Sequence, residues 1–252
     1  SPQVINVSEW DPKEKQRAGS SYSPSNQHAL KANGAHGLIA RCAKGNVNDN
    51  KCAAFLAGAE RQGLLLGSYY YIQPNRSTSS QASHFLRRLK EIKSSRNLHT
   101  SRILLAADFD TKCSAAQMAN FVEEIHNRTG IYPIVYLENS ERIRRALRNA
   151  TSSQKASLRR CPYWLALYSD TYPGIPAPKK LAQASGVWND WALWQYGGVF
   201  WEGGRSKIHN YSAGSWKTPK YFGSLDRPTE RNGFNGTTAE LHTLWNKHSW
   251  KW

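Results

Sequence analysis

The chain alternates short apolar runs with amphipathic segments of helical length, and this alternation restricts the folds that it can adopt. The apolar runs lie at residues 4–7, 37–43, 64–72, 103–110, 131–137, 163–168 and 192–196. Helical patterns lie at residues 49–62, 77–94, 114–129, 139–150 and, near the end of the chain, 237–248. Strands that alternate with helices of about 10–15 residues predict β-α-β units and a parallel sheet.

The number of strands favours closure of this sheet into a barrel. About eight candidate strands share one chain of 252 residues, and single α/β barrels commonly have roughly 200–250 residues. No glycine-rich phosphate-binding motif follows the first run, which disfavours a Rossmann or P-loop sheet. We therefore expect one α/β domain over residues 1–252, an irregular β/α barrel like the TIM barrel. Residues 197–228 show no periodicity and are expected to form a long irregular loop.

The charge balance restricts the partners. The chain has 34 Lys and Arg against 18 Asp and Glu, a formal net charge of +16. This excess favours a polyanionic partner (nucleic acid, an acidic membrane face or a bacterial wall) over a surplus that only aids solubility. Basic clusters at 87–93 and 142–148 are interpreted as solvated helix faces, with phosphate or wall contact as the alternative. No apolar run approaches the roughly 20 residues that span a bilayer.

Cysteines and glycosylation sequons give information on the cellular compartment of the protein. Cys42, Cys52, Cys113 and Cys161 form no C-x-x-C pair, so no structural zinc or other metal site is expected. They permit two disulfides in any of three connectivities, and a Cys42–Cys52 bond would close the shortest loop. The six N-x-S/T sequons and the absence of an initial Met fit a processed protein that is secreted or exported.

Two carboxylates at the end of the fourth apolar run form the sharpest candidate site. Strand side chains alternate between faces, so Asp108 and Asp110 project to the same side, above Leu104 and Ala106. Active sites of such barrels lie at the carboxyl ends of the strands. Adjacent carboxylates repel, which raises at least one pKa and leaves a proton for general acid catalysis. For an isolated D-x-D, a helix-capping Asp with a solvated charge is the alternative.

Several motifs, taken in order, resemble the glycoside hydrolase family 25 lysozymes, the Chalaropsis-type N-acetylmuramidases. They are INVSEW (5–10), GSYYY (67–71), LLAADFD (104–110), YPIVY (132–136), YWLALY (163–168), WQY (194–196) and ERNGFNG (230–236). The resemblance runs from about Val4 to Trp245. It implies an irregular β/α barrel that hydrolyses the β-1,4 bond between N-acetylmuramic acid and N-acetylglucosamine in peptidoglycan. It implies no metal and no organic cofactor.

The resemblance also assigns roles to residues. Asp110 occupies the position of the family's general acid, and Asp108 matches an Asp that assists at the anomeric carbon or acts more directly. The substrate-binding set that it implies is Asn6, Tyr69, Tyr71, Tyr136, Trp164, Trp194 and Glu230. For the aromatic residues in this set, packing in the core is the alternative to stacking on sugar rings.

Three of the four acidic positions depart from the family pattern. Asn6 stands where the family has Asp, Asp110 where it has Glu, and Glu230 where it has Asp. An acid displaced by about 1 Å can lose roughly 10²-fold in rate. The leading hypothesis is a rebuilt, active peptidoglycan hydrolase, and the alternative is a silent barrel that binds wall glycan. Glu138 is a weaker candidate for a substitute acid than for a residue that flanks the next helix.

A nucleic-acid binder is a third hypothesis from a different class. The basic charge would suit it, but the chain contains no recognised nucleic-acid motif, and the same charge suits an anionic cell wall equally well. Peptidoglycan or a related anionic wall glycan is therefore the expected partner.

Overall fold

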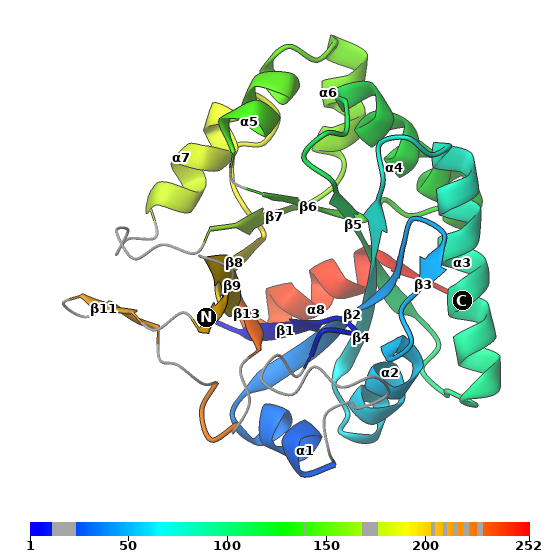
Figure 1. The fold of residues 1–252 in the computed structure, drawn as a ribbon, viewed down its shortest axis with the longest axis vertical. Helices are drawn as coiled ribbons and strands as arrows, with labels where there is room; N and C mark the ends of the chain where they lie inside the picture. Colours follow the sequence, from blue (N-terminus) through cyan, green and yellow to red (C-terminus); the bar gives the residue numbers. More distant parts are fainter. Residues whose placement is uncertain are drawn as a thin grey trace.

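Eight strands close into a barrel in the computed structural model (Figure 1). The structure describes residues 1–11, 24–138, 140–167, 176–202, 205–208, 211–213, 216–218, 222–225 and 229–252. In spatial order the barrel strands are β1 (Gln3–Val7), β2 (Ala35–Lys44), β4 (Leu65–Ile72), β5 (Ile103–Phe109), β6 (Ile134–Glu138), β7 (Tyr163–Ala166), β8 (Leu193–Gly197) and β13 (Glu230–Phe234). The α/β barrel expected from the alternation of strands and helices is confirmed.

The last strand differs from the others in direction. The strands from β1 to β8 pair in parallel, whereas β13 pairs antiparallel with both of its neighbours, β1 and β8. The start of β13 therefore lies at the edge where the parallel strands end, and Glu230 is paired with Asn6 there. This antiparallel strand makes the barrel irregular and brings the Glu230 motif to the edge that carries Asp108.

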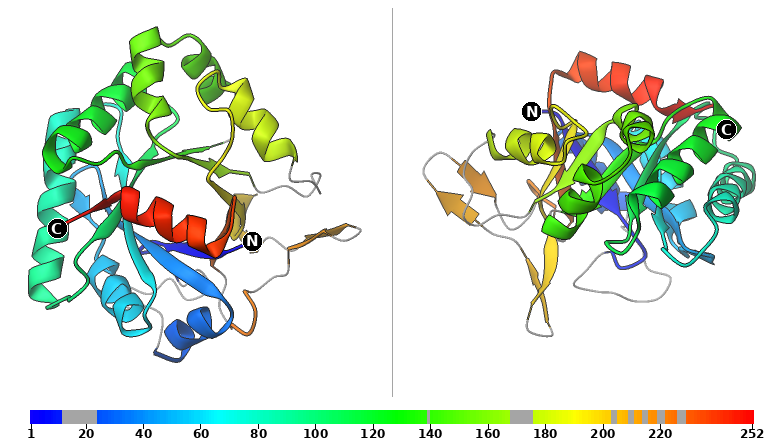
Figure 2. Two further views of the ribbon diagram at one scale, coloured as in Figure 1. Left: turned by 180° about the vertical axis from the view of Figure 1, so that it is seen from behind. Right: turned by 90° about the horizontal axis from the view of Figure 1, so that it is seen from above.

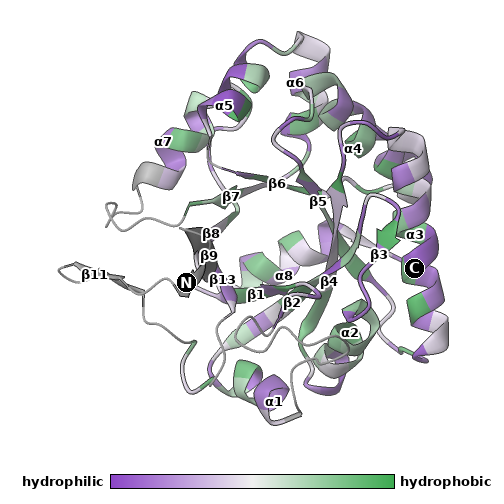
Figure 3. Cartoon of the chain, in the orientation of Figure 1, coloured by the Kyte–Doolittle hydropathy of each residue, from purple (hydrophilic) through white to green (hydrophobic). Residues whose placement is uncertain are grey.

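Helices surround the barrel (Figure 1). They are α1 (Pro24–Ala32), α2 (Cys52–Arg61), α3 (Thr78–Ser95), α4 (Ala115–Thr129), α5 (Glu141–Arg148), α6 (Ser152–Arg159), α7 (Pro176–Ala184) and α8 (Thr238–Lys247). The helix expected after Ser114 begins with that residue as N-cap, whose side chain accepts a hydrogen bond from Gln117 N–H, and ends at Gly130 with φ 79°. Hydrophobic and hydrophilic residues alternate along α3 and α4, as an amphipathic helix requires (Figure 3).

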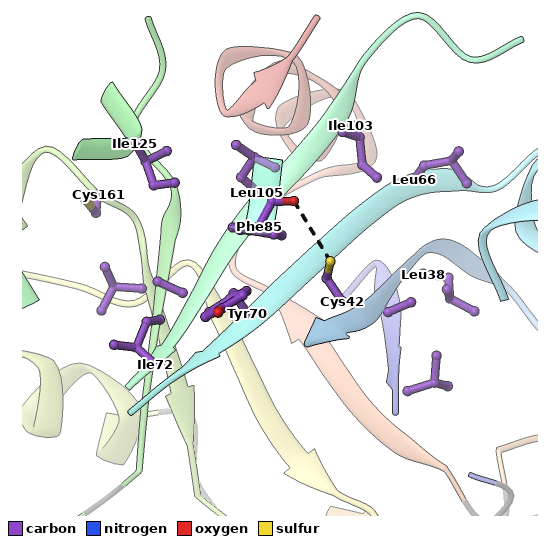
Figure 4. Close-up of a cluster of buried hydrophobic side chains, with 14 of the residues drawn as sticks. Leu38, Cys42, Leu66, Tyr70, Ile72, Phe85, Ile103, Leu105, Ile125 and Cys161 are labelled. Atoms are coloured by element: carbon purple, nitrogen blue, oxygen red, sulfur yellow. Dashed lines mark hydrogen bonds between the residues drawn. The ribbon is translucent and has the colours of Figure 1, made fainter. Parts of the chain in front are cut away.

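The buried side chains form two layers. The inner layer fills the barrel and includes Val4, Ile39, Leu104, Ile134 and Leu193. The outer layer lies between strands and helices, where Tyr70 of β4 meets Phe85 of α3 and Phe121 of α4 (Figure 4). Alternate residues of each strand serve the two layers, so the inward-facing residues at the strand ends form the barrel mouth.

Helix α8 covers the end of the barrel opposite that mouth (Figure 2). Its Trp245 is 3% exposed, and the indole N–H donates a hydrogen bond of 2.8 Å to the Leu66 carbonyl. The ring fits against Gly37, where an added Cβ would lie 2.6 Å from Trp245 Cη2, and against Gly67, where the closest contact with the ring would be 3.2 Å.

Replacing Gly37 with Ala should therefore destabilise the protein. The rigid, enclosed indole ring has to shift to admit the methyl group, and overpacking of this kind costs about 1–3 kcal/mol. Urea unfolding followed by tryptophan fluorescence measures the effect. Gly67→Ala, with its longer contacts, should cost less, and equal stability of Gly37→Ala and the wild type would contradict this packing.

The four cysteines are all free and buried. The Cys42 thiol donates a hydrogen bond to the Phe85 carbonyl (Figure 4), and burial raises the pKa of this thiol well above its usual value. None of the three disulfide connectivities that the sequence permits is present among these described residues.

The described parts of residues 197–228 contain more regular structure than the sequence indicated. Two antiparallel hairpins, β9 (Val199–Glu202) with β10 (Arg205–Ile208) and β11 (Tyr211–Ala213) with β12 (Trp216–Thr218), project outward from the barrel (Figure 2). Two short strands extend the main sheet: β3 (Val47–Asn48) pairs with β2, and β14 (Ser249–Trp250) pairs with β5. Among the described residues, no helix is both long and apolar enough to cross a bilayer.

Candidate active site at the barrel mouth

Acidic, tyrosine and asparagine side chains from five strands converge at the barrel mouth. Tyr69 of β4 and Tyr136 of β6 both lie in the electrostatic field of Asp108 of β5 and Glu230 of β13. Burial is the main cause that raises the pKa of each tyrosine well above its usual value, and the two carboxyl groups raise it further. Asn6 of β1 is paired with Glu230 at the same edge. The structure thus brings together residues that are up to 224 positions apart in the sequence.

Asp108 is partly buried, and its pKa is raised from 3.8 to about 7. Burial is the largest cause, and the negative charges of Asp110 and Glu138 add to it. The positive charges of Arg41 and Lys44 oppose the shift without cancelling it. No hydrogen bond joins the Asp108 carboxyl group to another side chain or backbone N–H in the described part of the chain. At neutral pH this carboxyl group is therefore about half protonated.

Asp110 has the opposite environment, because this chain supplies donors to both of its carboxyl oxygens. The Tyr71 hydroxyl donates to Oδ2 at 2.6 Å, and the backbone N–H of Lys112 donates to Oδ1 at 2.8 Å. Burial alone would raise the pKa of Asp110, but these two hydrogen bonds and the charges of Lys112 and Lys44 outweigh it and lower the pKa. Asp110 is therefore ionised at neutral pH.

The two carboxyl groups thus have pKa values that are pushed apart by their surroundings. Such a pair can supply a proton donor and an ionised carboxylate at the same pH. Asp108 is the member that retains a proton, whereas Asp110 closes the turn before α4 through its bond to Lys112. The D-x-D pattern located both residues, but it did not indicate which of them holds the proton.

A charged network beside the pair was missed in the sequence. Arg41 of β2 is 9% exposed, and its Nε donates to both carboxyl oxygens of Asp49 at 2.9 and 3.0 Å. Its Nη2 lies 3.4 Å from a Glu9 carboxyl oxygen. Charge interactions with Asp49 and Glu9 help to raise the pKa of Arg41 despite its burial. The sequence feature that could have revealed this network is Arg41, the single charged residue in the apolar run GLIARCA (37–43). A buried Arg requires acidic partners.

A network of amides forms the opposite side of the mouth. Asn6 Oδ1 accepts hydrogen bonds from Gln195 Nε2 at 3.0 Å and from Asn232 Nδ2 at 2.9 Å. Asn232 Oδ1 accepts from the Trp164 indole N–H at 2.7 Å, and the Tyr136 hydroxyl donates to Gln195 Oε1 at 2.7 Å. Asn6 therefore acts as a double acceptor, a role that an Asp carboxylate at this position would also fill.

Replacing Asn232 with Ala should lower the free energy of unfolding by about 2–3 kcal/mol. Asn232 is 0% exposed, and its loss removes partners from the Trp164 indole N–H and from the Val4 carbonyl. A buried polar group left without a partner costs about 1–3 kcal/mol. Asn235→Ala is the matched control, since Asn235 is exposed and its side chain makes one bond, to the Trp191 carbonyl. Denaturant unfolding should separate the two variants, and equal losses would contradict the network.

The aromatic candidates divide between the mouth and the core. Trp164 is 1% exposed and meets Tyr69 and Tyr136 edge-on, with ring centroids 6.3 and 4.9 Å apart, so it forms the floor beneath the acid pair. Tyr71 holds Asp110 and lies under Lys44, whose Nζ is 5.0 Å from the ring centroid. Trp194 faces the outer layer, where its indole N–H donates to the Leu167 carbonyl at 3.0 Å, as the core-packing alternative requires.

Two further expectations concern Glu138 and metal ions. Glu138 is exposed at the end of β6, and its charge contributes to the raised pKa of Asp108. In the described part of the chain, no group of three or more His, Cys, Asp or Glu side chains is arranged to hold a metal ion.

The barrel has the same fold as several solved lysozyme and muramidase structures. A lysozyme of family GH25 from Aspergillus fumigatus is 23% identical, with a TM-score of 0.63 over 96% of this chain and 98% of the other. A muramidase from Trichobolus zukalii is 20% identical, with a TM-score of 0.64 over 97% and 99%. The lysozyme from Streptomyces coelicolor is 20% identical, with a TM-score of 0.62 over 97% and 96%. At these identities the likeness shows the fold.

The family is shown by the sequence itself. No curated protein matches the chain significantly. The family model described as "Glycosyl hydrolases family 25" matches residues 5–200, which include Asn6, Tyr69, Asp108 and Tyr136 of the mouth. The match covers more than half of the chain, so this protein belongs to glycoside hydrolase family 25.

Proposed function

We propose that this protein is a peptidoglycan hydrolase of the muramidase type, which cleaves the β-1,4 bond between N-acetylmuramic acid and N-acetylglucosamine. Membership of family 25 and the likeness to lysozyme and muramidase structures support this function. The observation that carries it is the pair of carboxyl groups at the barrel mouth, one with a raised pKa and one with a lowered pKa. Glycoside hydrolysis requires two carboxyl groups in these different states.

Asp108 is assigned as the proton donor and Asp110 as the ionised carboxylate. Asp108 gives its proton to the glycosidic oxygen as the bond to the anomeric carbon breaks, and Asp110 stabilises the positive charge that develops there. Water then adds to the anomeric carbon, and the proton that it releases restores Asp108. This order reverses the roles that the family resemblance implies, because in this chain Tyr71 and Lys112 hold Asp110 in the ionised form.

The basic surface fits the proposed substrate. Peptidoglycan and the polymers attached to it carry carboxylate and phosphate groups, and a net charge of +16 favours approach to such a surface. Action on a cell wall requires export from the cell that makes the protein, so we place the protein outside that cell. Nucleic acid is not part of this proposal.

The silent glycan-binding barrel is the second candidate and is less favoured. It was suggested by the departures at Asn6, Asp110 and Glu230. The amide network accommodates Asn6 as an acceptor, and the acid pair retains a carboxyl group that is protonated near neutral pH. These two features remove the main reasons for assuming that catalysis has been lost.

Mass spectrometry of the soluble products released from purified peptidoglycan tests the proposed function. The wild type should release muropeptides that end in reducing N-acetylmuramic acid, and Asp108→Asn should release none above background. Asp190→Asn, the same exchange at an exposed position away from the mouth, should behave as the wild type does. Wild-type protein that sediments with the wall but releases nothing would support the silent barrel instead.

A further inference from the structure

A basic cleft on the outside of the barrel has no part in the proposed hydrolysis. It lies beside the N-terminal half of α3, facing the turn between β2 and β3, and has a volume of about 670 Å³. Arg76, Arg87 and Arg128 line it, and none of the described residues in its lining is Asp or Glu. We call it the α3 cleft.

A buried hydroxyl group faces the cleft without a partner. Tyr70 lines the cleft and is 0% exposed, and its hydroxyl has no hydrogen-bond partner among the described residues. Packing against Phe85 and Phe121, with ring centroids 5.4 and 6.3 Å away, fixes the position of the ring. Burial raises the pKa of Tyr70, and the charges of Arg76 and Arg87 act against that rise.

The three arginines keep donors available for a ligand. Arg76 Nε donates to Gln73 Oε1 at 2.7 Å, and Arg87 Nη2 lies 3.4 Å from His84 Nδ1. Of the three, Arg128 is the one with a carboxylate partner in the described part of the chain, Glu124 at 3.1 Å. A guanidinium group has five N–H donors, so these contacts leave several donors on each.

The start of α3 adds positive potential to the same cleft. The helix is capped by Ser77, whose side chain accepts from Ser80 N–H, and its first turn contains no acidic residue. The N-terminus of a helix carries a partial positive charge and N–H groups that point outward. Together with the arginines and the buried hydroxyl, it forms a site for a group with several negatively charged oxygens.

We propose that the α3 cleft binds a phosphate group, presented by a phosphodiester polymer of the cell envelope. A second cleft of about 730 Å³ adjoins it and shares Ser83, Arg87 and Arg128, so the groove continues along α3 beyond one phosphate unit. Besides His84, the aromatic rings that line the two clefts are Tyr70 and Trp250, which are 0% and 8% exposed. Nucleic acid is therefore disfavoured as the polymer, since single strands bind by stacking bases on exposed rings.

Isothermal titration of the full chain tests the proposal with two probes, inorganic phosphate and poly(glycerol phosphate). Both should bind to the wild type, and the polymer should bind more tightly. Arg76→Gln with Arg87→Gln should weaken both affinities about tenfold or more, because two charged donors are lost. Tyr70→Phe keeps the packed ring and should weaken them about threefold to tenfold, as expected for the loss of one hydrogen bond.

The matched control changes the same charge elsewhere. Arg142→Gln with Arg145→Gln alters two exposed arginines on α5 and should leave the affinity for inorganic phosphate within about twofold. Equal losses of phosphate affinity in both double variants, or no loss in the cleft variant, would contradict a phosphate site in the α3 cleft. Polyglutamate that binds as tightly as poly(glycerol phosphate) would overturn the choice of phosphate. If a single-stranded oligonucleotide binds more tightly than poly(glycerol phosphate), the proposal that the ligand is a polymer of the cell envelope is wrong.

The outcome is independent of the muramidase proposal. The cleft variants leave every residue of the barrel mouth intact. Muropeptide release can therefore be observed without phosphate binding, and phosphate binding can be observed without muropeptide release. The loop that contains Arg76 follows β4, whose Tyr71 holds Asp110. A polymer anchored in the α3 cleft would consequently lie close to the mouth.

Discussion

Asp108→Asn is expected to reduce the rate of muropeptide release about 10³-fold at pH 6. The exchange keeps the size of the side chain but removes the carboxyl proton, and general acid catalysis contributes typically 10²–10⁴-fold. The wild-type rate should also fall as pH rises above about 7, the pKa of Asp108, because the protonated fraction then falls tenfold per pH unit. The rate of reducing-end formation between pH 4 and pH 9 measures both effects.

The pH profile separates the two possible assignments of the acid. Burial is the largest cause that raises the pKa of Asp108, the charges of Asp110 and Glu138 add to it, and those of Arg41 and Lys44 oppose it. If Asp110 were the proton donor, its lowered pKa would make the activity fall at a more acidic pH than the pKa of Asp108. An activity that falls on the acidic side of this range and shows no further change near pH 7 would contradict the assignment of Asp108.

The same exchange is expected to stabilise the protein at high pH. The pKa of Asp108 is 3.8 in an ordinary environment and about 7 in the fold. Below pH 3.8 both the folded and unfolded states keep the proton. As pH rises from about 4 to 7, the unfolded state loses the proton first, so the folded state loses up to roughly 4 kcal/mol of stability relative to it. Asn does not ionise and avoids this loss.

Urea unfolding at pH 4 and pH 8 should therefore show a gain for Asp108→Asn that grows with pH. At pH 8 the variant should exceed the wild type by up to about 4 kcal/mol, and at pH 4 the difference should be close to zero. Asp190→Asn serves as the control, since Asp190 is exposed and should give no comparable gain. A variant that is less stable than the wild type at pH 8 would mean that Asp108 is held as a carboxylate.

Much of the fold could be predicted from the sequence because its main strands are apolar and regularly spaced. The closing strand β13 could not be predicted as a strand, because its sequence ERNGF contains two charges and a glycine. It is extended because it completes the barrel between β1 and β8. Tertiary context overrides local β-propensity at such positions.

The position of the candidate site could be predicted from the sequence, but the pKa shifts of its two carboxyl groups could not. Asp110 lies just beyond the end of β5 at Phe109, so strand alternation no longer fixes its side chain. Its two hydrogen bonds depend on the register that sets Tyr71 beside Asp108 and on a turn that ends at Lys112. Neither follows from the D-x-D pattern. Trp194 packs in the outer layer, whereas its neighbour Gln195 faces the mouth, because adjacent strand residues face opposite sides.

The proposed mechanism requires that Asp108 holds the proton of the acid pair while Asp110 is ionised. Carbon-13 NMR titration of the aspartate carboxyl groups, assigned with Asp108→Asn and Asp110→Asn, tests it most directly. We expect a pKa of about 7 for Asp108 and a pKa below 3.8 for Asp110. A pKa for Asp110 above that of Asp108 would contradict the account and return the role of proton donor to Asp110.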